Sequence, residues 1–483
     1  MLKTANSDYF FQANFLKGHN MIIKIDKNSH PLYKTIYTQI KAEILSGGLA
    51  LHEKLPPTRK LASNLGISRN TVELAYQQLV SEGYISVRQG SAYEVAVTGH
   101  ELWPHETDQN LLPYPAPASH TAMYDLWYPL IDSYSFPDPA WRRAIVNALN
   151  SLPGSHENSY YPAHTGDSAI RETLSTYLNR NFDVKCDPQQ ITLSCGFQIN
   201  LEILLKLFDS TKDYVAMENP GYYGARQVFE RNRFRVIPIP VDKRGISVEY
   251  LSNIHAKILY TTPAHQFPTG AYLTADRRIK LLEWAQENNA YIIEDAYDNE
   301  LQYDFQIMTS LQSLDQDGRV IYAGTFSKSL SPGLRVSYFV LPNRIIQRYH
   351  QNCGIYLSQV PTVTQLALAS YIQNGDLYKH LRKMRLIYSE KHKILCNSLK
   401  ETFGSSFVLF PCNGGTYVLT KYNTDLTNDN LIQSAAQNNI AVYSDKECWI
   451  NQNDAPVHQL LLGFGSIKTA DIPMIVKTLH NVW

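Results

Sequence analysis

The stretch GTFSKSLSPGLR, residues 324–335, decides how the longer part of this chain is interpreted. It places a lysine between two serines, just before a Pro-Gly turn and an arginine. Lys328 in this setting is a solvated surface charge, a phosphate ligand or the amine that anchors an aldehyde cofactor. Only the third interpretation makes demands on the rest of the chain, because such a cofactor needs several further binding groups.

An anion site is the first of these groups. Residues 194–208, SCGFQINLEILLKLF, have the pattern of a strand end, a glycine turn and a helix with an apolar face. The amides of Gly196, Phe197 and Gln198 would then lie at a helix N-terminus, where phosphates bind. Further phosphate donors follow near the lysine: the hydroxyl groups of Thr325 and Ser327, and the guanidinium of Arg335, which can bind in bidentate fashion.

Groups that suit an aromatic ring stand between these two stretches. The sequence ENPGYYGAR presents Tyr222 after a Pro-Gly turn, and YIIEDAYDNE ends an apolar strand with Asp295 and Tyr297. In parallel sheets ligands bind at the carboxyl ends of the strands. Taken singly, an aspartate after a strand is more often a helix cap and a tyrosine more often a packing residue. Their occurrence in this order, ahead of Lys328, favours a cofactor site.

This ordered set resembles the fold-type I pyridoxal 5′-phosphate enzymes of the aspartate aminotransferase class, over about residues 125–483. The resemblance implies that Lys328 forms a Schiff base (an aldimine) with the cofactor and that Asp295 pairs with the pyridine nitrogen. Tyr297 would bond the ring oxygen, and Tyr222 would stack on the ring. Tyr161, in YYPAHTG, would reach the phosphate of a neighbouring subunit in a head-to-tail homodimer. The implied phosphate ligands are Gly196, Phe197, Gln198, Thr325, Ser327 and Arg335.

The remainder of this long domain predicts an α/β fold. Helical stretches alternate with short apolar runs such as YVAME, AKILYTTP and VIYAG, which indicates a mostly parallel sheet. After about residue 345 the pattern changes to a smaller C-terminal α+β subdomain. Upstream, residues 97–124 contain four prolines between 104 and 117, which is typical of a linker.

Residues 21–96 predict a separate helical module. Leu32, Ile36, Ile40 and Ile44 recur every four residues, which predicts one amphipathic helix. Residues 68–81 give a second apolar stripe at i, i+3, i+4 and i+7, with a serine at the expected N-cap. A two-stranded ribbon follows. From the pattern alone, a protein-interaction module and a DNA-binding module both remain open.

The residues themselves favour DNA. The stretch LPPTRKLASNLGISRNTVELAYQQLVSEGYI resembles the winged helix-turn-helix of GntR-type bacterial regulators, over essentially residues 30–95. The resemblance implies that Arg59 holds phosphates, that the recognition helix reads bases in the major groove and that Gly90 lies in the wing. The expected DNA contacts are Arg59, Arg69, Asn70, Thr71 and Gly90.

Composition narrows the class of protein. A chain of 483 residues predicts two or three domains, and six cysteines without a CxxC pair fit a reduced protein with no metal site. Equal numbers of basic and acidic residues, 44 each, give no global signal for nucleic acid. We find no apolar run that would span a membrane and no signal peptide, so a cytoplasmic location is expected. Residues 1–20 are either a disordered tail or lie upstream of an initiator at Met21.

The two halves together resemble the MocR family of transcriptional regulators. This resemblance implies a homodimer that binds operator DNA and in which aldimine formation with pyridoxal phosphate or an amine effector, at Lys328, modulates DNA binding. The alternative is a working aminotransferase with a passenger module. Two positions argue against that alternative: Phe267 stands where aminotransferases carry an asparagine, and Leu461 where many relatives carry the arginine that binds a substrate carboxylate. Arg226 and His458 are the possible substitutes. An effector that is the cofactor itself, with target genes in vitamin B6 metabolism, is the hypothesis these departures favour.

Overall fold

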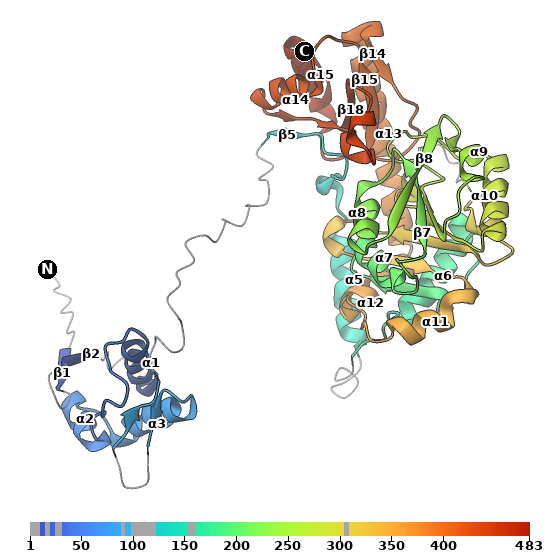
Figure 1. Ribbon diagram of the computed structural model, residues 1–483. Helices are drawn as coiled ribbons and strands as arrows, with labels where there is room; N and C mark the ends of the chain where they lie inside the picture. Colours follow the sequence, from blue (N-terminus) through green and yellow to red (C-terminus); the bar gives the residue numbers. More distant parts are fainter. Residues whose placement is uncertain are drawn as a thin grey trace. The chain divides into compact units, whose positions relative to one another are not determined.

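A computed structural model describes residues 10–14, 20–24, 31–87, 92–97, 122–152, 161–303 and 309–483. The chain divides into two compact units, Met1–Ala118 and Ser119–Trp483 (Figure 1). Within the described ranges, we find no helix with both the length and the apolar character that a bilayer crossing requires. Each unit has its own apolar core.

Three helices lie in the described part of the first unit, and their apolar residues meet in one core. Ile36, Ile40 and Ile44 of the first helix are fully buried, as are Val72 and Leu79 of the third. The hydroxyl of Ser68 accepts a hydrogen bond from the Thr71 amide at 3.2 Å, so the predicted N-cap is confirmed. The helices are α1 (Leu32–Leu45), α2 (Thr58–Leu65) and α3 (Arg69–Ser81).

Two antiparallel strand pairs accompany these helices among the described residues of the unit. The predicted ribbon is formed by β3 (Ile85–Ser86) and β4 (Glu94–Val95), while Gly90 lies outside the described residues. The second pair joins β1 (Phe10–Asn14) to β2 (Asn20–Lys24). The expectation of a disordered tail is therefore wrong for residues 10–14. The physical reason is apolar burial, because Ile23 of the same hairpin is fully buried in the core of the module.

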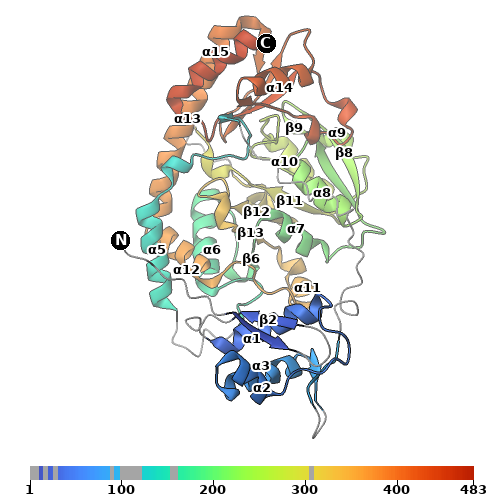
Figure 2. The ribbon, with the colours of Figure 1, turned by 90° about the vertical axis from the view of Figure 1, so that its left-hand side faces the viewer.

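An eight-stranded sheet organises the second unit (Figure 2). Five neighbouring strands, β12, β11, β10, β7 and β8, are parallel, and β13 runs antiparallel between β12 and β6. The mostly parallel sheet predicted from sequence is thus confirmed. In spatial order the strands are β6 (Ile191–Ser194), β13 (Ser337–Val340), β12 (Val320–Thr325), β11 (Tyr291–Asp295), β10 (Ile258–Thr261), β7 (Tyr214–Asn219), β8 (Arg235–Asp242) and β9 (Gly245–Ile246).

Helices cover both faces of this sheet, which explains its apolar strands. The adjacent residues Ile292 and Ile293 of β11 are both fully buried, but they belong to different clusters on opposite faces. The helices are α5 (Asp138–Ser151), α6 (Ser168–Phe182), α7 (Phe197–Leu205), α8 (Tyr223–Arg231), α9 (Val248–Leu251), α10 (Ala275–Glu287), α11 (Asn343–Cys353) and α12 (Thr362–Gln373).

A second, four-stranded sheet lies in the C-terminal part, together with a 28-residue helix. Residues of α11 and α12 pack into the cores of the large sheet, so the second sheet with its helices begins after them. Its elements are α13 (Asp376–Phe403), β14 (Phe407–Leu409), β15 (Tyr417–Tyr422), α14 (Asn428–Gln437), β17 (Tyr443–Ser444), β18 (Gln459–Gly463) and α15 (Ile472–Val482). A short strand just after the linker, β5 (Tyr124–Asp125), pairs with β16 (Ile440–Ala441).

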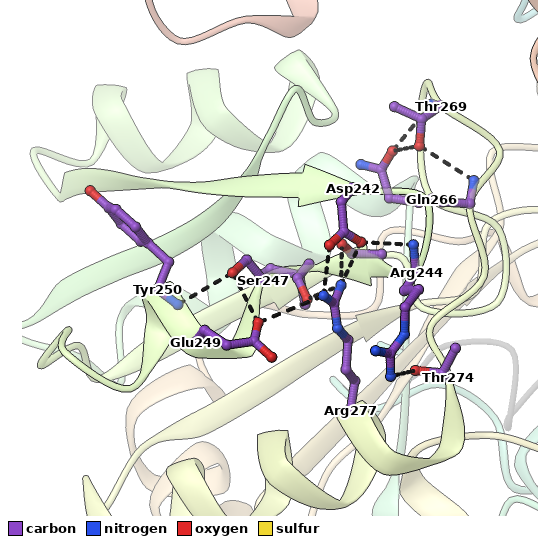
Figure 3. Close-up of polar contacts among 12 residues, drawn as sticks. Asp242, Arg244, Ser247, Glu249, Tyr250, Gln266, Thr269, Thr274 and Arg277 are labelled. Atoms are coloured by element: carbon purple, nitrogen blue, oxygen red, sulfur yellow. Dashed lines mark hydrogen bonds and ion pairs between the residues drawn. The ribbon is translucent and has the colours of Figure 1, made fainter.

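Arg277 of α10 holds the turn between β8 and β9 (Figure 3). Its guanidinium is almost fully buried and donates to both carboxylate oxygens of Asp242, at 2.6 and 2.7 Å. The same group donates to the carbonyls of Gly245 and Ile246 at 2.9 and 3.1 Å. One side chain thereby satisfies acceptors on both strands of the hairpin at the edge of the sheet.

Candidate functional site

A cavity of about 330 Å³ lies where the parallel strands end. Because β11 and β12 are parallel neighbours, Asp295 at the end of one and Thr325 at the end of the other reach the same edge of the sheet. Of the residues predicted for the cofactor, nine line this cavity: Phe197, Gln198, Tyr222, Asp295, Tyr297, Thr325, Ser327, Lys328 and Arg335. The fold therefore brings together side chains from widely separated stretches of sequence.

Lys328 follows the last residues of β12 and points at a backbone carbonyl. Its Nζ donates to the carbonyl oxygen of Tyr128 at 3.0 Å and lies 5.2 Å from the centre of the Tyr128 ring. Protein surrounds the amine, and this desolvation lowers the pKa of Lys328 to about 7, against a smaller opposing effect of Asp298. A large fraction of the amine is therefore neutral, and hence nucleophilic, at neutral pH.

Asp295 is a buried carboxyl group with one close partner. The hydroxyl of Tyr260 donates to its Oδ2 at 2.5 Å. Burial raises the pKa of Asp295 to about 7, although the Tyr260 hydrogen bond acts in the opposite direction. This carboxyl group can share a proton with a basic ring nitrogen. A protonated nitrogen beside Asp295 would lower the pKa of the carboxyl group and favour its ionised form.

Tyr297 lies in a buried polar network. Its hydroxyl is 3.0 Å from Nδ1 of His265 and 3.2 Å from the hydroxyl of Tyr417. His265 Nδ1 is also 2.7 Å from the Asp298 carboxylate. Burial is the largest single influence and lowers the pKa of His265, but Asp298 and Cys412 together outweigh it and hold this pKa well above the usual range. The imidazolium and Tyr417 fix the position of the Tyr297 hydroxyl at the cavity.

Phosphate donors gather at one end of the cavity, next to the N-terminus of α7. A side chain at Gly196 would place its Cβ 2.1 Å from the Arg335 guanidinium, and the φ of Gly196 is +103°. Glycine is therefore required for the close approach of Arg335 to the first turn of α7. The Thr325 hydroxyl donates to Ser327 Oγ at 3.0 Å. Amides, hydroxyl groups and a guanidinium at one end fit a phosphate monoester.

Aromatic rings form the rest of the cavity wall. The Tyr222 hydroxyl accepts a hydrogen bond from Gln198 Nε2 at 2.9 Å, which orients its ring. Phe197 packs edge-on against Tyr222, with centroids 6.2 Å apart. Phe267 is buried and lies 4.7 Å from the Tyr128 ring. Where Phe267 stands, the cavity has an apolar surface and no hydrogen-bonding group.

Hydrogen bonds to Glu218 fix the start of the loop that carries Phe267. This buried carboxylate accepts hydrogen bonds from the hydroxyl groups of Thr261 and Thr262, at 2.6 and 2.7 Å. Gln266 Oε1 in turn accepts from the amide and hydroxyl of Thr269, which closes the turn (Figure 3). The position of Phe267 is therefore fixed by buried polar contacts on both sides.

Several other predicted positions lie away from the cavity. The guanidinium of Arg226 donates to the carbonyls of Trp449 and Glu447, at 2.6 and 2.9 Å, and His458 does not line the cavity. Neither residue offers a cation to a ligand there. Tyr161 is 83% exposed and does not line the cavity, so its expected contact with a neighbouring subunit remains a prediction.

The expected DNA contacts of the first unit lie on its surface. Arg59, Arg69 and Asn70 are exposed and Thr71 is half-buried; Gly90, as stated above, is outside the described residues. Arg69 is 3.6 Å from the Glu73 carboxylate, one turn along α3. An exposed pair of this kind is weak. The guanidinium therefore remains available to another partner.

Sequence reasoning missed partners of Lys328, Asp295 and Tyr297 in the site. Tyr128 offers a carbonyl, which no side-chain pattern signals. Tyr260 lies inside an apolar strand, where a tyrosine is usually a packing residue. His265 belongs to the stretch TPAHQFPTG, residues 262–270, in which the sequence analysis considers Phe267 alone. A histidine and Asp298 near the same predicted strand ends were the only signal for the network around Tyr297.

Comparison with protein families matches both units. The family described as bacterial regulatory proteins of the gntR family covers residues 32–95, and the aminotransferase class I and II family covers residues 130–450. The second match spans well over half of the chain.

Several relatives match over nearly their whole length. An HTH-type transcriptional regulator of Bacillus subtilis, YdeL, is 36% identical, with 94% of this chain and 97% of the relative covered. The probable rhizopine catabolism regulatory protein MocR of Rhizobium meliloti is 31% identical over 84% of this chain and 85% of its own. The HTH-type pyridoxine biosynthesis transcriptional regulator PdxR of Corynebacterium glutamicum is 29% identical, covering 89% and 90%.

Among solved structures, the kynurenine aminotransferase of Pyrococcus horikoshii, crystallised with PMP, resembles the second unit. The TM-score is 0.67 and the sequence identity 25%, with 74% of this chain and 90% of the aminotransferase covered. The sheet and its flanking helices therefore have the architecture of an aminotransferase.

Proposed function

This chain belongs to the MocR-type transcriptional regulators, which join a gntR-family module to an aminotransferase class I and II domain, and we propose that occupancy of the pocket at Lys328 changes its binding to DNA. Its cofactor is pyridoxal 5′-phosphate. The observation that carries the proposal is the meeting of Lys328, Asp295 and Tyr297 in one cavity whose far end holds phosphate donors.

Each residue has a defined task toward the cofactor. When bound, pyridoxal phosphate supplies an aldehyde for amines and a ring that accepts electrons. Lys328 presents a neutral amine, and Asp295 would hold the proton of the ring nitrogen. Tyr297, positioned by His265, would donate to the ring oxygen. Arg335, with the hydroxyl groups of Thr325 and Ser327, would bind the phosphate.

The segment from β5 to Tyr128 supports a covalent path along the chain from the pocket to the DNA-binding module. Strand β5 begins at the last residue of the predicted linker, and three residues after the strand ends Tyr128 contacts Lys328 through its carbonyl. The Thr416 hydroxyl donates to the same carbonyl at 3.1 Å. Any ligand that takes the Lys328 amine changes this contact. A residue just after β5 thus contacts the reactive amine, and a difference in affinity between two states can be transmitted along the chain.

Dimerisation and operator recognition are parts of the same proposal. Family membership supports a head-to-tail homodimer in which two modules bind two half-sites. Tyr161, which is exposed and precedes α6 in the sequence, is the residue that we assign to the neighbouring subunit's phosphate. The protein would act in the cytoplasm. Its target genes would belong to the metabolism of vitamin B6 or of amino compounds, and the relative PdxR is named for pyridoxine biosynthesis.

The test is a DNA-binding titration at fixed salt, with the DNA upstream of the protein's own coding sequence as the probe. We expect pyridoxal phosphate to change the dissociation constant of the wild-type protein by about fivefold or more, within the usual range of allosteric coupling. The variant Lys328→Ala should bind the same DNA but not respond. Identical wild-type curves with the cofactor, without it and with added amines would overturn the proposal.

A working aminotransferase is the second candidate, and the intact set of Lys328, Asp295 and Tyr297 favours it. Buried Phe267 and Leu461 oppose it, because neither can bond a substrate's polar groups. Steady-state turnover of an amino donor and a keto acid at roughly 1 per second would establish the enzyme. Turnover orders of magnitude slower would leave the regulator as the function.

A further inference from the structure

The wall of the pocket beside Lys328 consists of aromatic side chains. We call Trp127, Tyr128, Tyr223 and Phe267 the aromatic wall; all four line the cavity and belong to one apolar cluster. Tyr128 contacts both Phe267, at 4.7 Å between centroids, and the Tyr223 hydroxyl. The amine of Lys328 lies over the Tyr128 ring, so this ring of the wall faces the reactive nitrogen.

Charged groups in the lining are few, and among them Lys328 is the one placed against the aromatic wall. Among the described residues that line the cavity, the Asp, Glu, Lys and Arg side chains are Asp295, Lys328 and Arg335. Arg335 donates to the Cys195 carbonyl at 3.2 Å and lies against Gly196, at the phosphate end. Arg226, the next guanidinium on α8, is bound to two carbonyls. No described guanidinium or ammonium other than the reactive amine therefore faces the aromatic wall.

This arrangement discriminates between ligands by charge. A carboxylate placed against the aromatic wall would lose its hydration without gaining a guanidinium partner, which is costly. An apolar or aromatic group would exchange water for ring contacts. An ammonium group is also tolerated, since aromatic faces attract cations.

We infer that the pocket at Lys328 selects primary amines that carry an apolar or aromatic body and no carboxylate, with the body against the aromatic wall and the amino group toward Lys328. The inference rests on the proposed function, because it assigns the effector of that pocket. It predicts that amines regulate DNA binding where the corresponding amino acids do not.

The experiment compares ligands that differ only by the carboxylate. Phenethylamine with phenylalanine and tryptamine with tryptophan are titrated into the full-length protein, with and without pyridoxal phosphate, by calorimetry and by the visible band of the bound cofactor. Each amine should bind on the order of tenfold or more tightly than its amino acid, a difference of about 1.4 kcal/mol. Equal binding, or tighter binding of the amino acids, overturns the inference.

Failure of the proposed function has a different signature. If no visible band develops, pyridoxal phosphate does not bind and the proposed function falls. Calorimetry on the cofactor-free protein still reports whether amines are preferred, so this inference is judged in either case.

Two substitutions at one half-buried position make the test specific. Tyr223→Leu removes a ring while keeping apolar bulk, and Tyr223→Arg adds a guanidinium to the wall. We expect Tyr223→Leu to weaken phenethylamine binding severalfold without helping phenylalanine. Tyr223→Arg should shift the preference toward phenylalanine by about tenfold. If both variants keep the wild-type ratio of the two affinities, the aromatic wall does not select the ligand; circular dichroism checks that each variant is folded.

Discussion

The amine of Lys328 donates a hydrogen bond to the carbonyl of Tyr128 at 3.0 Å, across 200 residues of sequence. This bond joins the end of β12 to the segment that enters the second unit after the linker. It orients the amine toward the cavity while leaving the nitrogen in a desolvated setting. The reactivity of the lysine and the position of Tyr128 are therefore linked.

Replacing Lys328 removes the covalent anchor. Lys328→Ala and Lys328→Arg should both fail to develop the visible band that the wild-type protein shows with pyridoxal phosphate, because a guanidinium does not react with the aldehyde at neutral pH. Absorption spectroscopy after removal of free cofactor is the measurement. Lys206→Ala, at an exposed lysine of the same unit, is the control and should keep the band. An unchanged band in Lys328→Ala would assign the anchor to another lysine.

The rate of cofactor uptake should depend on pH. The pKa of Lys328 is lowered to about 7, so the amine is neutral above that pH and protonated below it. Stopped-flow rates of band formation should therefore fall about tenfold per pH unit below 7 and level off above it, as expected for a single titrating nucleophile. A midpoint near 10, typical of exposed lysines, would show that burial does not tune this amine.

Asp295 should destabilise the cofactor-free protein at high pH. Its folded-state pKa is raised from 3.8 to about 7, so the stability it contributes is present below pH 4 and lost as pH rises to 7. Asp295→Asn does not titrate and should be more stable than wild type at pH 8, by at most roughly 4 kcal/mol at 1.36 kcal/mol per pKa unit. The two proteins should converge only below about pH 4, under the unfolded-state pKa. Denaturant titrations at both pH values measure this, and equal stability at pH 8 would contradict it.

Arg69 should contribute to DNA binding and its neighbour Glu73 should oppose it. Arg69→Ala removes a donor at the start of the recognition helix, with an expected cost of about 1–3 kcal/mol. Glu73→Ala frees the Arg69 guanidinium and removes a negative charge, so it should leave affinity unchanged or increase it. Fluorescence anisotropy at one salt concentration compares the variants. Equal losses from both substitutions would indicate damage to α3 rather than lost contacts.

Arg277 should stabilise the second unit more than Arg244 does. Arg277→Lys keeps the charge but cannot make the paired bonds to Asp242 together with those to the two carbonyls. We expect a loss of about 2 kcal/mol. Arg244 pairs with Asp276 at the surface, and Arg244→Ala should cost under about 1 kcal/mol. Chemical denaturation followed by circular dichroism tests the order, which the reverse ranking would refute.

Local sequence patterns determined a large part of this protein. The apolar stripes of α1 and α3 require only the helical period, and the Ser68 cap only a hydroxyl three residues before the Thr71 amide. The alternation of helices and apolar runs determined the parallel sheet. The order of Asp295 and Lys328 at successive strand ends predicted the cavity, because parallel strands end at one edge.

Only the tertiary structure decided how these groups are tuned. The Tyr260 hydroxyl donates a hydrogen bond to Asp295, 35 residues away in sequence. The Arg226 guanidinium donates to carbonyls of residues more than 200 positions away. The strand hairpin before α1 likewise depends on Ile23 reaching the core of its module. Such contacts depend on how whole elements pack, whereas a sequence pattern reports only the preferences of neighbouring residues. The sequence therefore determined which chemical groups are present, and packing decided their partners, their desolvation and hence their pKa values.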